Sequence, residues 1–168
     1  MKRIVIFGNS GSGKSTLAQH LSEQYNLVHL DLDTLAWQDT QPPSRQPIES
    51  SLIKINGFIS QHAAWVIEGC YSDLIELILP KSNEMYFMNL PIEACIENAK
   101  ARPWEPHKYP SKAEQDKNLD MLLDWISQYP VRNDTFSQQA HQAIFNAYRG
   151  SKHMLTHNLS LEAIAERS

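Results

Sequence analysis

The sequence predicts an α/β fold with three layers, in which helices cover both faces of a five-stranded, mostly parallel sheet. Two observations lead to this prediction. Five short apolar segments alternate with segments of helical periodicity, and such alternation is typical of parallel strands joined by right-handed helical crossovers. The first apolar segment, residues 3–7, is followed at once by a glycine-rich turn and then by a helical pattern. We therefore expect a strand, a loop and a helix at the start of the chain.

The first part of the chain supplies three of the five strands. Residues 3–7 (RIVIF) are apolar and β-branched, as expected for a strand buried on both faces. Residues 14–24 carry leucines and an alanine at helical spacing, and residues 27–31 (LVHLD) are predicted to be a second strand that ends in an acid. Residues 34–63, with several prolines before a weakly amphipathic stretch, are predicted to be an inserted loop and helix that precede a third strand at residues 64–68.

The middle of the chain continues the alternation. A short helix over residues 73–79, ended by Pro80, is predicted to lead into the fourth strand at residues 84–90. Residues 92–101 follow a proline at a favoured first-turn position and are predicted to be helical. Residues 102–115 contain three prolines, so we expect irregular backbone there.

The last part of the chain is predicted to be mainly helical. Helical patterns cover residues 116–129 and 134–149, and the second ends at a glycine, as helices commonly do. Residues 152–156 are predicted to be the fifth strand. Residues 160–167 are predicted to be a final helix, for which a serine is a suitable N-cap.

Length and composition restrict the class of protein. The 168 residues suit one compact domain, residues 1–168, and we expect a monomer or a small homo-oligomer. The net charge of -4 argues against binding to nucleic acid or to an anionic membrane, because both partners require a basic surface. The apolar segments are too short for a membrane span or a signal peptide, so a cytoplasmic protein is expected. Cys70 and Cys95 lack the spacing of a metal or redox motif and are expected to be buried and inert.

The glycine-rich turn matches the pattern G-x-x-x-x-G-K-[ST] in full and has the expected strand before it and helix after it. Glycines let the backbone turn tightly, so that several N–H groups converge on a phosphate, and the helix start adds its positive dipole end. Lys14 supplies a charge to the β and γ oxygens, and the hydroxyl of Ser15 can bind Mg²⁺. The predicted nucleotide-binding residues are Gly8, Asn9, Ser10, Gly11, Ser12, Gly13, Lys14, Ser15 and Thr16.

Three acids follow neighbouring strands on the same edge of the predicted sheet. Ligands of open parallel sheets bind beyond the carboxyl ends of the strands, where the phosphate loop lies. We expect Asp31 and Glu68 to join Ser15 in holding Mg²⁺, and Asp33 to accept a proton. Strand alternation would place Asp31 and Asp33 on the same side. The alternatives are that Asp33 caps the following helix and that Glu68 is exposed to solvent.

Together these features resemble the shikimate-kinase-like and adenylate-kinase-like group of small P-loop kinases, including the topology-modulation or FlaR-like proteins. The resemblance is carried by GNSGSGKST, by Asp31-Leu32-Asp33 with Leu35 and Trp37, by VIEG at residues 66–69 and by the cationic segment from Arg102. It implies a three-layer P-loop NTPase fold with a lid.

The resemblance also implies roles for particular residues. Asp31 and Asp33 are similar to the acid pair of shikimate kinases, in which one acid supports Mg²⁺ and the other contacts the acceptor hydroxyl. Glu68-Gly69 resembles the acid-glycine pair of nucleoside monophosphate kinases. Arg102 stands where such kinases begin their lid, and Arg132 resembles a second arginine that follows it. Lys14, Asp33, Arg102 and Arg132 are therefore the predicted catalytic residues.

The segment from about 102 to 118 is the predicted lid. Phosphoryl transfer needs cations around the moving group and exclusion of water, and this segment carries Arg102, His107, Lys108 and Lys112. Its Trp104 and Tyr109 would close the site or stack on a base. The alternative is an ordinary surface loop with solvated cations.

The function predicted from these features is ATP- and Mg²⁺-dependent transfer of a phosphoryl group to a small molecule. Cys70-Tyr71-Ser72-Asp73 lacks the arginine that nucleoside monophosphate kinases use, and Arg45 is the sole arginine of residues 4–101. An uncharged or hydroxyl acceptor, contacted by the inserted region at about 34–63, is therefore favoured over a nucleotide. A nucleoside monophosphate kinase stays open, as do a nucleotide-dependent regulatory ATPase or switch and a binding module without catalysis. No N-K-x-D guanine motif occurs, so a GTPase is the weaker form of the switch.

Overall fold

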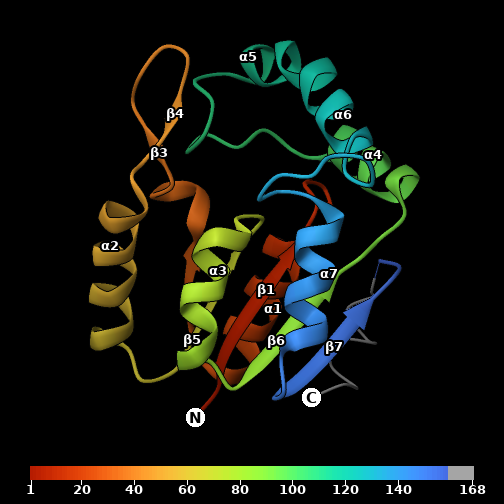
Figure 1. The fold of residues 1–168 in the computed structure, drawn as a ribbon. Helices are drawn as coiled ribbons and strands as arrows, with labels where there is room; N and C mark the ends of the chain where they lie inside the picture. Colours follow the sequence, from red (N-terminus) through yellow and green to blue (C-terminus); the bar gives the residue numbers. More distant parts are fainter. Residues whose placement is uncertain (159–168) are drawn as a thin grey trace.

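A five-stranded parallel sheet forms the centre of the computed structural model, which describes residues 1–158 (Figure 1). The strand order is β2-β5-β1-β6-β7, and all four neighbouring pairs run parallel. The predicted fold class is thus confirmed. The strands are β1 (Arg3–Gly8), β2 (Val28–Asp31), β5 (Trp65–Gly69), β6 (Glu84–Met88) and β7 (Ser151–Leu155).

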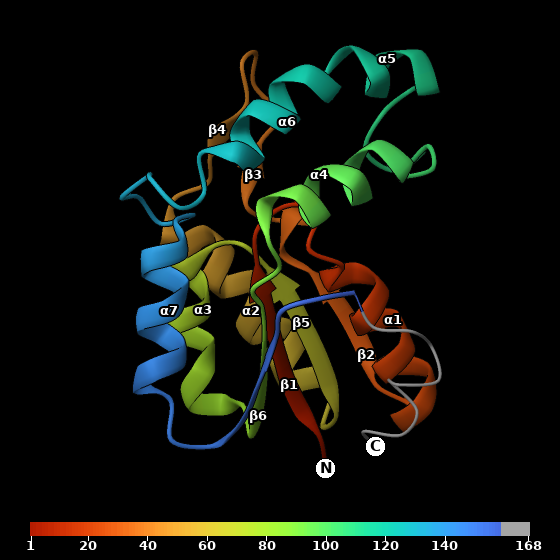
Figure 2. The ribbon, with the colours of Figure 1, turned by 90° about the vertical axis from the view of Figure 1, so that its right-hand side faces the viewer.

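Two helical layers cover the faces of this sheet (Figures 1 and 2). On one face α1 (Lys14–Tyr25) and α4 (Ile92–Ala101) pack against alternate residues of the strands, such as Ile4 and Ile6 of β1. On the other face α2 (Ile48–Gln61), α3 (Ser72–Ile78) and α7 (Gln138–Ala147) pack against the residues between them. Because β1, β5 and β6 are buried on both faces, their sequences are mainly apolar, with Glu68 and Glu84 as the buried acids.

The region between β2 and β5 contains a hairpin that the sequence did not predict. A 3-10 turn, η1 (Leu32–Thr34), follows β2, and the antiparallel pair β3 (Trp37–Gln38) and β4 (Ser44–Arg45) comes next, before α2. Strands of two residues have no alternation that a sequence pattern can reveal. The hairpin projects above the carboxyl edge of the sheet, where β1, β2 and β5 end (Figure 1).

The segment between α4 and α7 also lies above this edge (Figures 1 and 2). It contains α5 (Lys112–Lys117) and α6 (Leu119–Ser127). The helical pattern predicted for residues 116–129 is thus divided between two helices, and the prediction of irregular backbone as far as residue 115 is wrong, because α5 begins at Lys112. The Ser111 hydroxyl accepts a hydrogen bond from the Glu114 N–H at 3.2 Å and begins α5 directly after the last proline of the loop.

The other boundaries differ less from the prediction. α7 begins at Gln138 rather than at residue 134, because the Ser137 hydroxyl caps it by accepting a hydrogen bond from the Ala140 N–H at 3.0 Å. Pro80 lies inside a second 3-10 turn, η2 (Leu79–Lys81), which follows α3. The helix predicted for residues 160–167 lies outside the described residues. Within residues 1–158, none of the helices has the length and apolar character needed to cross a membrane.

Candidate active site

The phosphate loop connects β1 to α1 and packs tightly against the neighbouring elements. Gly11 has a φ of +75°, and a Cβ atom there would lie 2.4 Å from the carbonyl oxygen of Cys95 in α4. Gly13, the residue before α1, has a φ of +88°, which is also in the left-handed region. Both positions require glycine, although Gly13 is a fixed position of the motif and Gly11 is one of its variable positions.

Polar side chains hold the loop from two sides. The Asn9 amide donates a hydrogen bond to the Ile126 carbonyl in α6 at 3.2 Å, and the Asn98 amide donates one to the Gly11 carbonyl at 2.8 Å. The Lys14 ammonium donates a hydrogen bond to the Asn9 carbonyl at 2.7 Å, so it lies across the loop. The buried hydroxyl of Ser12 has no hydrogen-bond partner within residues 1–158. An unpaired buried hydroxyl in such a loop suits a polar ligand.

Ser15 and Glu68 come together beside the loop. The Ser15 hydroxyl donates a hydrogen bond to Oε2 of Glu68 at 2.6 Å, and Nε2 of His29 lies 3.1 Å from the same oxygen. Glu68 is only 2% exposed, so the alternative of a solvated carboxylate is wrong. His29 is two residues before Asp31 on β2 and shares its side of the strand, which is the sequence signal that could have identified it.

The two aspartates lie close together, but by a different geometry from the predicted one. β2 ends at Asp31, and Asp33 belongs to the turn η1. Asp31 caps this turn, because its side chain accepts a hydrogen bond from the Asp33 N–H at 2.9 Å. The alternative in which Asp33 is the cap is therefore wrong. Nζ of Lys108 lies 3.0 Å from Oδ2 of Asp33 and 3.7 Å from Oδ2 of Asp31, so both acids face the same cation.

The environments of the two aspartates shift their pKa values in opposite directions. Burial, followed by the charges of Glu68 and Asp33, raises the pKa of Asp31 to about 6. Partial burial by itself would raise the pKa of Asp33 too, but the Lys108 ammonium and a hydrogen bond from Tyr71 outweigh it and hold that pKa below its ordinary value. Burial likewise opposes the charge of Lys108, yet the neighbouring acids raise its pKa. The Lys108–Asp33 contact is therefore between an ammonium and a carboxylate.

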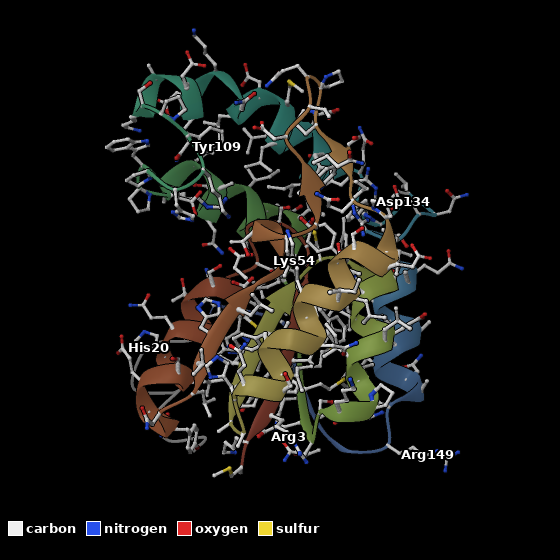
Figure 3. The ribbon with its side chains drawn as sticks, turned by 90° about the vertical axis from the view of Figure 1, so that its left-hand side faces the viewer. Arg3, His20, Lys54, Tyr109, Asp134 and Arg149 are labelled. Atoms are coloured by element: carbon white, nitrogen blue, oxygen red, sulfur yellow. The ribbon has the colours of Figure 1, made fainter. Side chains whose placement is uncertain are left out.

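Residues 102–118 pass over the loop and the acids. This segment can be found in Figure 3 by its label Tyr109. Arg102 lies 3.7 Å from Glu105, and both side chains line a cavity beside the loop. Of the four cations predicted to act in the segment, Arg102 and Lys108 border this cavity, whereas Lys112 pairs with Asp116 on the surface. Nε1 of Trp104 donates a hydrogen bond to the Tyr109 carbonyl at 3.0 Å.

Arg132 and Arg45 both lie outside this cavity. The Arg132 guanidinium stacks 3.4 Å from the ring centroid of Trp125 and donates a hydrogen bond to Asp134 at 3.0 Å. Arg45 pairs with Asp73 at 3.2 Å, and its guanidinium lies 4.8 Å from the ring centroid of Tyr71. The structure thus does not bring Arg132 to the phosphate loop.

Two adjacent cavities border the phosphate loop. One, of about 340 Å³, is lined by Lys14, Ser15, Asp33, Glu68, Arg102 and Lys108, among others. The second, of about 370 Å³, extends along α4 and includes Asn98 and Asn158. The residues shared by both walls are Gly11, Gly13, Thr16, Arg102 and Pro103. The cavities therefore form an elongated space with the loop at its centre.

Two cysteines and a tyrosine also lie close to the phosphate loop or to the acids. Cys95 is buried as predicted, whereas Cys70 is half-buried as a residue and lines the cavity beside Glu68, so the burial of Cys70 is less complete than expected. Burial raises the pKa of Cys70 to about 12 and keeps the thiol protonated. Tyr71, whose hydroxyl donates a hydrogen bond to Asp33, was not predicted, because one aromatic residue after a strand gives no motif.

The oxygen atoms at the site suit Mg²⁺. A hydroxyl, Ser15, and a carboxylate, Glu68, already lie within 2.6 Å of each other, and hard oxygen ligands are those that Mg²⁺ prefers. Asp31 is next to Glu68 on the adjacent strand. No cluster of three or more His, Cys, Asp and Glu side chains arranged for a metal ion occurs within residues 1–158.

Comparisons with known proteins agree with this geometry. A family model described as AAA domain matches residues 4–121. An uncharacterized protein of Bacillus subtilis (strain 168), YqaC, is 28% identical over 134 residues, which are 76% of this chain and 72% of that protein.

Two solved structures are similar in fold. A sugar kinase from Janibacter sp. HTCC2649 superimposes with a TM-score of 0.58 at 15% identity, covering 99% of this chain and 91% of the kinase. A shikimate kinase from Bacteroides thetaiotaomicron gives a TM-score of 0.52 at 15% identity, covering 99% of this chain and 95% of that enzyme. At this identity the likeness is one of fold, and together with the family match it confirms that the chain resembles small P-loop kinases in fold.

Proposed function

We propose that this chain, which belongs to the AAA domain family, binds ATP with Mg²⁺ and transfers the γ-phosphoryl group to a hydroxyl group of a small molecule. The observation that carries the proposal is the arrangement of Lys14, Ser15, Glu68 and Asp33 around one cavity beside the phosphate loop. These side chains supply a phosphate-binding cation, two oxygen ligands for a metal ion and a carboxylate. Phosphoryl transfer needs this combination, because most of its catalysis is positioning and charge stabilisation.

The nucleotide is proposed to occupy both cavities. Its phosphates would lie against the loop N–H groups, the start of α1 and the Lys14 ammonium, in the cavity of about 340 Å³. Its base and ribose would extend into the cavity of about 370 Å³, whose wall includes the amides of Asn98 and Asn158, hydrogen-bonded to each other at 2.9 and 3.1 Å. Arg102 borders both cavities and would neutralise charge on the transferred group.

Ser15 and Glu68, with Asp31 beside them, would hold Mg²⁺. When bound, this ion would neutralise charge on the β- and γ-phosphate oxygens. His29 contacts Glu68 at 3.1 Å and would keep its carboxylate in place.

Asp33 is proposed to act on the acceptor. Its carboxylate would take the proton of the acceptor hydroxyl as that oxygen bonds to the γ-phosphorus atom, while the bond from phosphorus to the β–γ bridging oxygen breaks and ADP leaves. Lys108 now contacts Oδ2 of Asp33 and would have to release it when the acceptor binds. Residues 102–118 would thus act as a lid, and the inserted region at about 34–63 would contact the acceptor.

A hydroxyl acceptor without a phosphate group agrees best with the contacts of Arg45. The arginine of the inserted region, Arg45, already pairs with Asp73 and packs on the Tyr71 ring. A nucleoside monophosphate would need a cation of this kind for its own phosphate. This observation disfavours a nucleoside monophosphate kinase.

A coupled assay of ADP release tests the proposal. Wild-type protein with Mg·ATP is mixed in turn with sugars, cyclic polyols, other hydroxylated metabolites and nucleoside monophosphates. We expect at least one hydroxyl compound to raise ADP release well above the rate with water alone, and Asp33→Asn to abolish that increase. If no compound raises the rate, a regulatory ATPase becomes the better description.

A further inference from the structure

We propose that Tyr71 is a positioning residue for Asp33, whose hydroxyl holds one carboxylate oxygen and thereby directs the other toward the cavity. The inference rests on the proposed function, because it concerns the task of Asp33 in phosphoryl transfer. It adds a residue that neither the phosphate-loop motif nor the acid pair contains.

The two oxygens of Asp33 have different partners. Oδ1 accepts a hydrogen bond from the Tyr71 hydroxyl, and Oδ2 accepts one from Lys108 at 3.0 Å. Tyr71 is 2% exposed and does not line the cavity, whereas Asp33 and Lys108 do. An incoming acceptor can therefore take the place of Lys108 on Oδ2, but it cannot reach the partner of Oδ1.

The direction of the Tyr71 hydrogen bond is fixed by Trp37. Nε1 of Trp37 lies 2.8 Å from the Tyr71 hydroxyl oxygen, and an indole N–H can only donate. The tyrosine oxygen is thus an acceptor toward Trp37, and its single hydrogen remains for Asp33. Burial raises the pKa of Tyr71 far above its ordinary value, so the phenol keeps this hydrogen. The two hydrogen bonds therefore run in one direction, from Trp37 to Tyr71 and from Tyr71 to Asp33.

The ring of Tyr71 is held firmly from several sides. Its centroid lies 5.5 Å from that of Phe136 in an edge-to-face contact, and the Arg45 guanidinium covers it at 4.8 Å. Gly69 makes room for it, since a Cβ at that residue would lie 3.1 Å from Cδ2 of Tyr71 and 2.9 Å from Cβ of Leu32. These contacts fix the position of the Tyr71 hydroxyl, and Trp37 fixes the direction of its hydrogen bond.

Without the Tyr71 hydroxyl, the Asp33 carboxylate would lose this restraint. The terminal torsion of aspartate is broad, so the carboxylate would sample other orientations around the Lys108 contact. The loop, Lys14 and the metal-binding oxygens do not contact this hydroxyl. We therefore expect the loss to lower the rate of transfer and to leave ATP binding unchanged, as is typical of a group that acts in the transition state.

A set of variants tests the inference with Mg·ATP as the sole substrate and water as the acceptor. kcat and KM for ATP are measured for wild type, Tyr71→Phe, Asp33→Asn and the double variant. Tyr71→Phe should lower kcat roughly tenfold, as for loss of a hydrogen bond to a charged group, with KM within about twofold of wild type. In the Asp33→Asn background, Tyr71→Phe should cause no further decrease, because it acts through Asp33.

Two further variants make the comparison specific. Tyr86→Phe is the matched control, because Tyr86 is a buried tyrosine whose hydroxyl donates a hydrogen bond to Glu84 at 3.1 Å, away from the loop. It should leave kcat and KM unchanged. Trp37→Phe removes the N–H that directs the Tyr71 hydroxyl and should lower kcat by a smaller factor. Thermal unfolding shows whether Tyr71→Phe is folded. If it is not, Trp37→Phe still tests the same chain of hydrogen bonds.

The possible results separate the inference from the proposed function. Equal decreases by Tyr71→Phe in both backgrounds, or a higher KM with unchanged kcat, would overturn the positioning role and leave the proposed function intact. A wild type that binds ATP but releases no ADP, either with water or with any of the hydroxyl compounds, would contradict both.

Discussion

The Nζ atom of Lys108 lies 3.0 Å from Oδ2 of Asp33, although 75 residues separate the two along the chain. Lys108 also lies 3.7 Å from Asp31 and 3.8 Å from Glu105. This contact attaches the segment above the phosphate loop to the carboxyl edge of the sheet. It connects the two parts of the molecule that phosphoryl transfer would have to bring together.

We predict that Lys108→Ala loosens residues 102–118. A partly exposed ion pair contributes up to about 1 kcal/mol, which corresponds to roughly a fivefold change in an opening equilibrium. Digestion with a glutamate-specific protease, which can cut after Glu114, should therefore be several-fold faster in the variant. Lys112→Ala is the control, because Lys112 pairs with Asp116 in its own helix. Equal cleavage rates for both variants would contradict the attachment.

We predict that Gly11→Ala abolishes nucleotide binding. The new Cβ would lie 2.4 Å from the Cys95 carbonyl oxygen, and the φ of +75° is unfavourable for alanine, so the loop would have to change shape. Gly57→Ala is the matched control, since a Cβ at this position in α2 meets no atom within 4 Å. It should stabilise the protein by about 1 kcal/mol through helix propensity. Thermal shifts with and without Mg·ATP measure both effects.

We predict that Glu68→Gln weakens the dependence of ATP binding on Mg²⁺. The amide keeps the size of the side chain but removes a charge beside Ser15, so the gain in ATP affinity on adding Mg²⁺ should fall by about tenfold. Calorimetric titration with ATP, with and without Mg²⁺, measures that gain. Glu84→Gln is the control, because Glu84 begins β6 and binds Lys2 instead. An unchanged gain in the Glu68 variant would exclude Glu68 from the metal site.

We predict that acid weakens the fold through His141. This buried ring accepts a hydrogen bond from the Tyr129 hydroxyl at 2.6 Å and donates one to the Cys70 carbonyl at 2.9 Å, so it is neutral. Burial lowers its pKa from 6.5 to about 4. Between pH 6.5 and pH 4, His141 binds a proton in the unfolded chain but not in the folded chain. The contribution of the neutral ring to the free energy of unfolding is therefore complete above pH 6.5 and is lost as the pH falls toward 4. The full loss is about 3 kcal/mol.

Denaturant unfolding between pH 7.5 and 4.5 measures this effect. His141→Gln, which lacks a group that titrates in this range, should lose less free energy of unfolding than wild type over the same range. His157→Gln, at an exposed position, should follow the wild type. If wild type and His141→Gln lose stability in parallel, the acid sensitivity has another origin.

Local patterns were sufficient to predict the fold and the phosphate loop. Each buried strand is a mainly apolar run, and the loop follows the first of them directly. Helix boundaries were predicted less well, because caps such as Ser111 and Ser137 depend on one side-chain hydrogen bond each. The hairpin β3–β4 was missed, because its strands are too short to show a period.

The site was predicted in part for a similar reason. Motifs identified Lys14 and Ser15, and the ends of strands identified Asp31 and Glu68. No sequence pattern relates Tyr71 or Lys108 to Asp33, since those contacts join residues 38 and 75 positions apart. Arg132, chosen by family resemblance alone, stacks on Trp125 in the structure. Contacts that arise only when distant segments pack together require the folded chain.

Calorimetric titration with Mg·ATP tests the central claim, that the loop and Lys14 hold a nucleoside triphosphate, most directly. Wild type should bind ATP with measurable heat, Lys14→Ala should lose most of that binding, and Arg102→Ala should retain it while turning over more slowly. A wild type that gives no heat and no thermal protection with adenine or guanine triphosphates would contradict the account, and so would a Lys14→Ala variant that binds as tightly as wild type.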